Sequence, residues 1–280
     1  MKINLAKSAG FCFGVKRALK IAFDTIQSSS GVYMLGDIVH NEQVVREIEK
    51  AGIKKIKKLN SGKNKTLLIR AHGTSQRIMN NAVGLGYKII DATCPMVKEI
   101  HRVVREMDQN GYRVIVIGNK KHDEVQGIVG QIRNKAIVID LPENIPFKTI
   151  KKIKKACAVV QSTQNLDKAL KIARILKPLI KEFKFFNTVC RPTRIKQEEI
   201  KAMPKKNNLM IIIGSKTSAN TRRLYEISKS INKKSYWVHS NREIKPGWFK
   251  KVKTVGLTAG ASTPESTTME VIEYIKKFND

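Results

Sequence analysis

The sequence predicts an α/β fold of three pseudo-threefold-related domains, each with a small, mainly parallel sheet. Two observations carry this prediction: a threefold repeat anchored on cysteines, and apolar runs that alternate with helical patterns along the 280 residues. Near-continuous apolar strands that alternate with helices are typical of parallel sheets covered on both faces. The predicted domains are 1–93, 94–189 and 190–280, the last with a C-terminal closing segment.

Three of the four cysteines are followed, 28 residues later, by a polar residue just beyond an apolar run. The pairs are Cys12 with His40, Cys94 with His122, and Cys190 with Ser218. Cys157 has no such partner. Three equal intervals indicate one structural unit that occurs three times.

The first repeat shows the order of elements that all three share. An apolar run in "KINLAKSAGFC" (2–12) predicts a strand that leads into the cysteine. The apolar residues of the following helical pattern fall on one face: Val15, Leu19, Ala22, Phe23 and Ile26. The segments "VYMLGDIVH" (32–40) and "TLLIRAHGTS" (66–75) then predict two strands, whose loops carry His40 and His72.

The second and third repeats follow the same order. In the second, "YKIIDATC" precedes a helical pattern with Val97, Ile100, Val104 and Met107, and the strands are "YRVIVIGNKKH" and "ACAVVQSTQN". In the third, "FKFFNTVC" precedes a weaker helical pattern that Pro204 stops, and the strands are "LMIIIGSKTS" and "VGLTAGAST". The last segment, "STPESTTMEVIEYIKKF", predicts a capped closing helix.

The candidate site lies beyond the carboxyl ends of these strands, where parallel sheets bind ligands. If the three units face inward around a pseudo-threefold axis, Cys12, Cys94 and Cys190 meet at the centre. Three thiolates fit an iron–sulfur cluster with one open iron, or a zinc ion with an open position. The spacing leaves both alternatives open.

The polar loops favour an anionic ligand. Three histidines and several hydroxyl and amide groups provide many hydrogen-bond donors, which suits a diphosphate; they are His40, His72, His122, Ser218, Asn220 and Ser262. Metal binding by the histidines is the alternative, which the absence of a His-x-x-x-His spacing disfavours. Glu124, placed beside anionic groups, would have a raised pKa and could donate protons. Asp123 fits the helix N-cap better, which leaves Glu124 free for that role.

Composition favours a cytoplasmic enzyme. The net charge of +31 comes from scattered lysines, and aromatic residues make up only 6% of the chain, so we expect no specific nucleic-acid site. Such a charge attracts acidic molecules and acidic protein partners. No apolar run is long enough for a membrane span or a signal peptide. Without a Cys-x-x-Cys pair, the cysteines are expected to be reduced and not to form a zinc finger.

Seven ordered motifs resemble those of the 4-hydroxy-3-methylbut-2-enyl diphosphate reductase family, which completes the methylerythritol phosphate route to isoprenoids. The motifs are "AGFCFGVKRAL", "GDIVHN", "RAHG", "DATCP", "KHDEVQGIVGQ", "NTVC" and "TAGAST". The resemblance covers about residues 1 to 275. It implies a trefoil of three α/β domains around a central iron–sulfur cluster, with Cys12, Cys94 and Cys190 holding one 4Fe-4S cluster per chain whose fourth iron is open.

The same resemblance implies the roles of the loop residues. The implied substrate-binding residues are His40, His72, His122, Ser162, Thr163, Ser218, Ala219, Asn220 and Ser262. Glu124 would be the catalytic residue that delivers protons, helped by the hydroxyl of Ser162 or Thr163. Two electrons and protons would remove the substrate hydroxyl as water, which gives isopentenyl diphosphate and dimethylallyl diphosphate. A ferredoxin or flavodoxin would supply the electrons.

Three positions depart from the family pattern, and two other protein classes compete with it. Ala219 replaces a serine, Ser162 replaces a threonine, and the helix after Cys190 begins with Arg191 and further basic residues. Quinolinate synthase also combines three α/β units with three cysteines, but the "KHDE" and "TAGAST" loops disfavour it. A basic RNA-associated protein is the alternative that is not an enzyme, and salt-dependent RNA binding would identify it.

Overall fold

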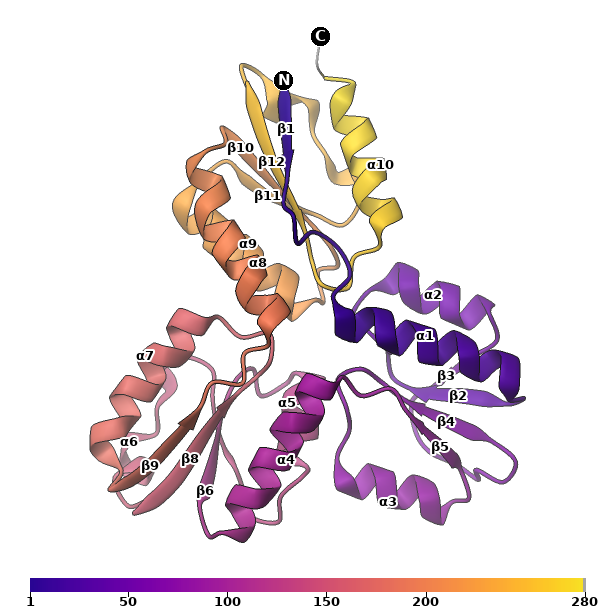
Figure 1. Ribbon diagram of the computed structural model, residues 1–280, viewed down its shortest axis with the longest axis vertical. Helices are drawn as coiled ribbons and strands as arrows, with labels where there is room; N and C mark the ends of the chain where they lie inside the picture. Colours follow the sequence, from indigo (N-terminus) through magenta and orange to yellow (C-terminus); the bar gives the residue numbers. More distant parts are fainter. Residues whose placement is uncertain (279–280) are drawn as a thin grey trace. The chain divides into compact units, whose positions relative to one another are not determined.

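Three four-stranded sheets, each with all strands parallel, form the framework of the chain (Figure 1). The computed structural model describes residues 1–278. One sheet contains, in spatial order, β3 (Lys54–Ile56), β2 (Val32–Leu35), β4 (Thr66–Ile69) and β5 (Lys88–Asp91). The next contains β7 (Ile137–Ile139), β6 (Arg113–Ile117), β8 (Lys155–Val160) and β9 (Glu182–Phe186). The last contains β11 (Ser235–Val238), β10 (Leu209–Ile213), β12 (Thr254–Ala259) and β1 (Lys2–Leu5). The predicted α/β class with small parallel sheets is confirmed.

The three sheets have equivalent strand orders, but the last one is completed from the other end of the chain. The strand that leads into a cysteine is always an edge strand: β5 before Cys94, β9 before Cys190 and β1 before Cys12. β1 pairs with β12, with Leu5 opposite Leu257. The predicted segment 1–93 therefore includes a strand that belongs to the sheet of the segment 190–280.

The helices predicted after the three cysteines, near Asp123 and at the C-terminal segment are present, as α1 (Phe13–Ser28), α4 (Pro95–Gln109), α8 (Arg191–Ala202), α5 (Asp123–Val129) and α10 (Glu265–Lys276). The structure adds α2 (Glu42–Lys50), α3 (Gln76–Gly84), α6 (Phe147–Ile150), α7 (Leu166–Leu176) and α9 (Ala219–Ile231). α8 ends two residues before Pro204, as predicted. Phe23, expected on the buried face of α1, is instead 41% exposed. α10 begins without a side-chain cap, because Pro264 occupies the N-cap position.

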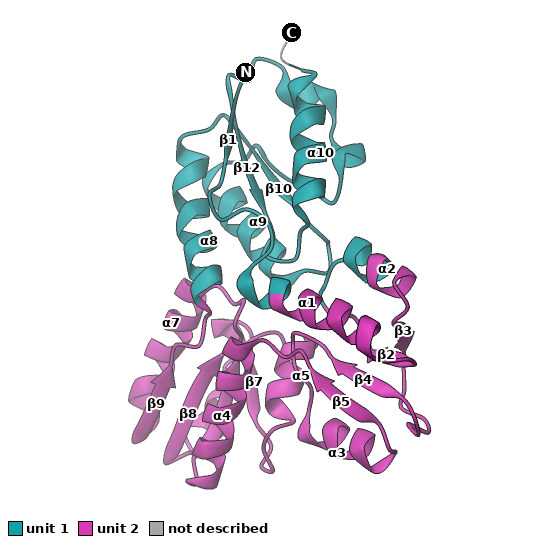
Figure 2. Cartoon of the chain, turned by 45° about the vertical axis from the view of Figure 1, so that its right-hand side comes forward, with its two compact units in different colours: residues 1–16, 39–46, 191–280 teal, residues 17–38, 47–190 magenta. Residues whose placement is uncertain are grey.

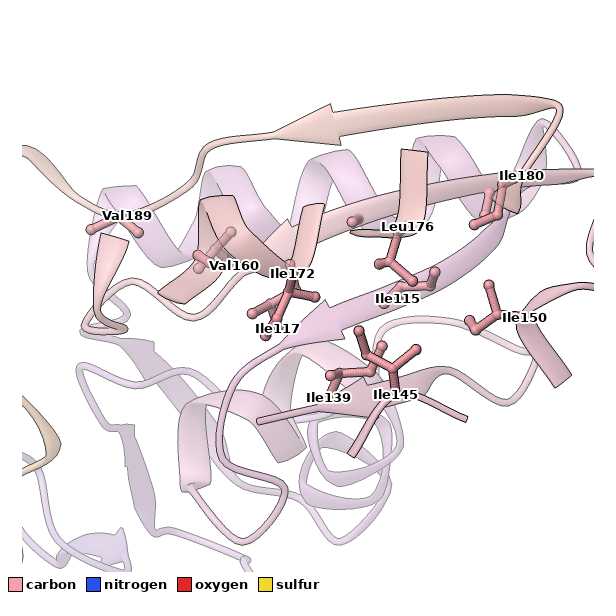
Figure 3. Close-up of a cluster of buried hydrophobic side chains, with 13 residues drawn as sticks. Ile115, Ile117, Ile139, Ile145, Ile150, Val160, Ile172, Leu176, Ile180 and Val189 are labelled. Atoms are coloured by element: carbon pink, nitrogen blue, oxygen red, sulfur yellow. The ribbon is translucent and has the colours of Figure 1, made fainter. Parts of the chain in front are cut away.

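The β6 sheet shows why the strands read as continuous apolar runs. Ile115 and Ile117 point to one face and pack with residues of α7 such as Ile172 (Figure 3). Val114 and Val116 point to the other face and pack with residues of α4 such as Val104. Because both faces are covered by helices, successive side chains are apolar on both sides of the strand.

The chain divides into two compact units, which Figure 2 colours separately. The first unit comprises residues 1–16, 39–46 and 191–280, and it contains the β10 sheet and the loop with His40. The second unit comprises residues 17–38 and 47–190, and it contains the other two sheets. Within residues 1–278, no helix combines the length and the apolar character that a membrane crossing requires.

Candidate functional site

Three cysteines occupy equivalent positions, each directly before a helix. Cys12 precedes α1, Cys94 precedes α4 and Cys190 precedes α8. The backbone amide of each donates to a loop carbonyl: Cys12 to Ala261 (3.1 Å), Cys94 to Ala71 (3.0 Å) and Cys190 to Ser162 (3.0 Å). Each acceptor lies two residues beyond the strand that neighbours the edge strand, namely β12, β4 and β8. The repeat therefore gives three thiols the same backbone setting.

These thiols have the chemistry that an iron–sulfur cluster requires. Cys12, Cys94 and Cys190 form no disulfide and are only partly buried, as cluster ligands need to be. Cys157 differs, because it lies inside β8 and is fully buried. Burial raises the pKa of Cys157 to about 12, which keeps it a neutral thiol. The donor set thus separates three candidate ligands from one core residue.

Within residues 1–278, no group of three or more histidine, cysteine, aspartate or glutamate side chains is arranged to hold a metal ion.

Two of the predicted histidines lie side by side in the second unit. The rings of His72 and His122 are 5.6 Å apart, centroid to centroid, in an edge-to-face arrangement. His122 Nδ1 accepts a hydrogen bond from the backbone amide of Glu124 (3.1 Å) and so caps α5. An accepting Nδ1 carries no proton, which leaves the Nε2 N–H of a neutral ring as a donor.

The prediction that Asp123 caps α5 was wrong. His122 is the N-cap, and Asp123 lies in the first turn. Its carboxylate binds Arg70, with Oδ2 2.6 Å from Nη1. Arg70 belongs to the "RAHG" segment, so this ion pair ties the loop that carries His72 to the helix that carries Glu124. Sequence periodicity gave no signal for this pair, because its members are 53 residues apart.

Glu124 and Ser162 meet in the interior of the second unit. Glu124 is 1% exposed, and its two carboxylate oxygens accept from the Ser162 amide (2.6 Å) and the Ser162 hydroxyl (2.8 Å). Burial raises the pKa of Glu124, whereas the hydrogen bonds from Ser162 act in the opposite direction. The pKa of Glu124 therefore lies above the usual value for a glutamate, and the carboxyl stays protonated to higher pH. The predicted raised pKa is present, and burial is its main cause.

Ser162, and not Thr163, contacts the candidate proton donor. The Thr163 hydroxyl accepts from Gln161 Nε2 (3.2 Å). Gln161 in turn accepts from the amide of Asn119 (3.0 Å), and it packs so closely on Gly118 that a Cβ there would lie 2.8 Å from it. Gln161 therefore links the loop after β8 to the loop after β6, and Thr163 contributes to that link.

In the first unit, the loop with His40 meets the loop after β12. The hydroxyl of Ser262 donates to the backbone carbonyl of His40 (3.0 Å). Thr267, at the start of α10, donates to the side chain of Gln43 (2.8 Å). Two predicted site residues, His40 and Ser262, are thus in contact. The sequence repeat had placed both at the ends of strands but had not paired them.

Asn220 has the most informative environment of the first unit. Ser218 caps α9 by accepting from the Thr221 amide (3.3 Å), and Ala219 and Asn220 form the first turn. Asn220 is 4% exposed, yet neither its side-chain oxygen nor its side-chain nitrogen has a hydrogen-bond partner among the described residues. Buried polar groups without partners are costly and uncommon in folded proteins. This amide is therefore suited to bind a polar ligand.

Glycines allow the loops after β10 and β12 to come close together. A Cβ at Gly260 would lie 2.0 Å from the Thr221 hydroxyl, and one at Gly214 would lie 2.7 Å from the hydroxyls of Thr221 and Thr263. Only glycine tolerates these approaches. The glycine of "TAGAST" thus lies directly against Thr221 in the first turn of α9.

Glu42 was missed by the sequence analysis, although it lies two residues after His40. It accepts from the hydroxyls of Ser215 (2.9 Å) and Thr217 (3.3 Å), and His239 Nδ1 is 3.9 Å away. Burial alone would raise the pKa of Glu42, but its own backbone amide, Ser215 and His239 outweigh burial and lower it. Glu42 is therefore an anion that holds the loop after β10 to the His40 segment.

Known proteins match this chain over nearly its full length. The model of the LytB protein family matches residues 3–276. The 4-hydroxy-3-methylbut-2-enyl diphosphate reductase of Geobacter metallireducens is 39% identical, with 100% of this chain and 98% of the relative covered. The enzyme of that name from Aquifex aeolicus is 40% identical, covering 98% of this chain and 94% of the relative.

Two solved structures are similar as well. The first is described as (E)-4-hydroxy-3-methyl-but-2-enyl diphosphate reductase, the terminal enzyme of the non-mevalonate pathway; it is 39% identical, with a TM-score of 0.72 and coverage of 99% of this chain and 100% of the other. The second is the E-1-hydroxy-2-methyl-but-2-enyl-4-diphosphate reductase of Plasmodium falciparum, 28% identical, with a TM-score of 0.89 and coverage of 97% and 87%.

Proposed function

The chain belongs to the LytB protein family, and from this premise we propose which of its residues carry out the reaction of that family. The reaction is the reductive dehydroxylation of 4-hydroxy-3-methylbut-2-enyl diphosphate to isopentenyl diphosphate and dimethylallyl diphosphate. Two electrons and two protons enter, the C–O bond of the allylic alcohol breaks, and water leaves. One proton goes to the departing oxygen and the other to carbon.

Cys12, Cys94 and Cys190 would hold the iron–sulfur cofactor, a 4Fe-4S cluster with one iron not bound by the protein. Their shared backbone setting and partial exposure support this assignment. When bound, the cluster supplies the electrons and an open iron for the substrate hydroxyl. The other residues bind and orient the substrate and handle protons.

The diphosphate binds to the donor-rich loops. In the first unit these donors are Ser218, Asn220, Ser262 and His40, with the backbone amide of Ala219 in place of a side-chain hydroxyl. The buried amide of Asn220 supports this role, because it has donor and acceptor capacity that the described residues leave unused. In the second unit the Nε2 N–H of His122 and the ring of His72 add imidazole donors.

Glu124 delivers the protons, and its environment is the observation that carries the proposal. It is a buried carboxyl whose pKa burial raises, so it holds its proton to higher pH than an exposed glutamate does. Ser162 fixes both carboxylate oxygens, which orients the proton and stabilises the carboxylate that remains after transfer. A proton from solvent must reach Glu124 before a second transfer, and the Ser162 hydroxyl can relay it along the same hydrogen bond.

The test is anaerobic turnover after reconstitution with iron and sulfide. A chemically reduced dye and 4-hydroxy-3-methylbut-2-enyl diphosphate are supplied to the wild type, to Glu124→Gln and to Glu143→Gln. Glu143 is exposed and serves as the matched control. Dye oxidation by the wild type and the control, with a large loss in Glu124→Gln, is the expected result. An iron-loaded wild type without turnover would refute the proposed activity.

The electron donor is an acidic protein such as a ferredoxin or flavodoxin. The net charge of +31 supports this choice, since opposite charges steer association. The rate with an acidic donor protein should fall as salt rises, because salt screens exposed charges. The rate with a neutral dye should not change. Equal salt dependence for both donors would refute docking by charge.

A further inference from the structure

The segment that leads into Cys12 differs from those that lead into the other two candidate cluster ligands. Six residues separate the end of β1 from Cys12, whereas two separate β5 from Cys94 and three separate β9 from Cys190. A longer irregular segment contains more backbone N–H and C=O groups that have no hydrogen-bond partner in a sheet. Each such group that is buried needs a partner elsewhere. The question is what holds the segment 6–11 in place.

Lys196 in α8 binds the carbonyls of this segment. Its ammonium donates to the carbonyl of Ser8, to that of Gly10 (3.1 Å) and to that of Ala259 at the end of β12 (3.1 Å). A lysine ammonium has three N–H groups, so all three are used. Lys196 is 2% exposed, which is rare for a lysine and is tolerated only with such partners.

Glu199, one turn further along α8, binds the amides of the same segment. Its carboxylate accepts from the amides of Lys7 (3.1 Å) and Ser8 (3.0 Å), and also from the Ser8 hydroxyl. Lys196 and Glu199, here called the α8 pair, thus bind the same short stretch of backbone, residues 7–10. Lys196 binds its carbonyl groups and Glu199 binds its amide groups. The stretch ends two residues before Cys12.

We propose that Lys196 and Glu199 are positioning residues for Cys12, which hold its backbone ready to bind the iron–sulfur cluster. The inference rests on the proposed role of Cys12 as a cluster ligand. The backbone amide of Cys12 donates to Ala261, two residues beyond Ala259, so the α8 pair fixes the chain on both sides of this hydrogen bond. Cys94 and Cys190 have shorter entry segments and do not depend on the pair.

The charges of the pair are consistent with this arrangement. Burial lowers the pKa of Lys196 to about 8, while the negative charges of Cys12 and Glu199 act in the opposite direction. The ammonium form therefore still predominates at neutral pH.

The test compares the alkylation rate of each cysteine in the metal-free full-length chain. Iodoacetamide labelling is followed by peptide mass spectrometry for the wild type, Lys196→Met, Lys196→Arg and Glu199→Gln. Glu198→Gln is the matched control, because Glu198 is the exposed neighbour on the same helix. Cys94 and Cys190 are controls within every sample.

Lys196→Met should raise the alkylation rate of Cys12 about tenfold, because it leaves buried carbonyls without donors and opens the segment. Cys94 and Cys190 should change by less than about twofold, and Lys196→Arg should restore most of the protection. After reconstitution, iron release from Lys196→Met to a chelator should be about tenfold faster.

An unchanged rate at Cys12, or equal increases at all three cysteines, would overturn the proposal. If Lys196→Met does not fold, Glu199→Gln decides, because it removes a charge while keeping the shape of the side chain. The labelling needs no cluster and no substrate. A wild type that binds iron but lacks turnover would therefore refute the proposed function and leave the labelling result valid.

Discussion

The two units hold different kinds of proposed site residue. The second unit holds Glu124, a buried carboxyl whose pKa burial raises, together with the imidazoles of His72 and His122. The first unit holds mainly hydroxyl and amide groups, of which Asn220 is buried without a partner among the described residues. The comparison teaches that the proposed proton donor and the buried amide without a partner lie in different units, so substitutions of Glu124 and Asn220 can separate proton delivery from this part of anion binding.

The largest effect should come from the second unit. Glu124→Gln keeps the shape of the side chain but cannot donate an acidic proton, so kcat should fall by about 10²–10⁴. KM should change by less than about threefold, because the protonated carboxyl and the amide are both neutral. Steady-state kinetics with a reduced dye measure both values. A rise in KM with an unchanged kcat would contradict this assignment, because it would show that Glu124 binds the substrate and does not donate the proton.

The next largest effect should come from the first unit, and it should change KM and not kcat. Asn220→Leu removes a buried amide that would bind the diphosphate, so KM should rise about tenfold while kcat stays nearly constant. The same variant should be more stable by about 1–2 kcal/mol, since an unpartnered buried polar group is replaced by an apolar one. Kinetics and urea unfolding check the two parts. Loss of both stability and activity would identify Asn220 as structural.

A smaller effect should sharpen the role of Ser162. Ser162→Ala removes a hydrogen bond that lowers the pKa of Glu124, so that pKa should rise further. The reaction needs the protonated acid, and the rate falls as pH rises through its pKa; this alkaline limb should therefore move to higher pH. We expect kcat at the optimum to fall about tenfold. Thr163→Val, which leaves the Glu124 contact intact, is the control.

The smallest effect concerns Ala219, where the sequence resemblance leads us to expect a serine. Ala219→Ser would add a hydroxyl to the first turn of α9, beside Asn220. KM should fall by about two- to threefold, because one further hydrogen bond to an anion is gained. A rise in KM would show that the diphosphate does not lie at this end of the helix.

Much of the fold could be predicted because it depends on local periodicity. Apolar runs located the strands, and the spacing of Val97, Ile100, Val104 and Met107 located α4 and its buried face. The partner of β1 could not be predicted in this way. It lies at the other end of the chain, and pairing between β1 and β12 leaves no periodic signal in either strand.

The site shows the same limit at the level of side chains. The equivalent positions of Cys12, Cys94 and Cys190 followed from equal spacing, and the proposed role of Glu124 from the chemistry of a carboxyl among anions. The cap formed by His122 and the contact of Ser162 with Glu124 depend on loop geometry, which a repeat does not encode.

The weak helical pattern after Cys190 has a structural reason. α8 buries Lys196 and Gln197 because this part of the helix packs against irregular backbone, which offers hydrogen bonds in place of apolar contacts. A search for apolar periodicity therefore underestimates this helix. No structural reason was found for Arg191, which is exposed at its start.

The division between the units is tested most directly by the binding of inorganic diphosphate to the full-length chain, measured by calorimetry. The account predicts that Glu124→Gln binds diphosphate as tightly as the wild type, whereas Asn220→Leu binds it about tenfold more weakly. Weaker binding by Glu124→Gln together with unchanged binding by Asn220→Leu would contradict it.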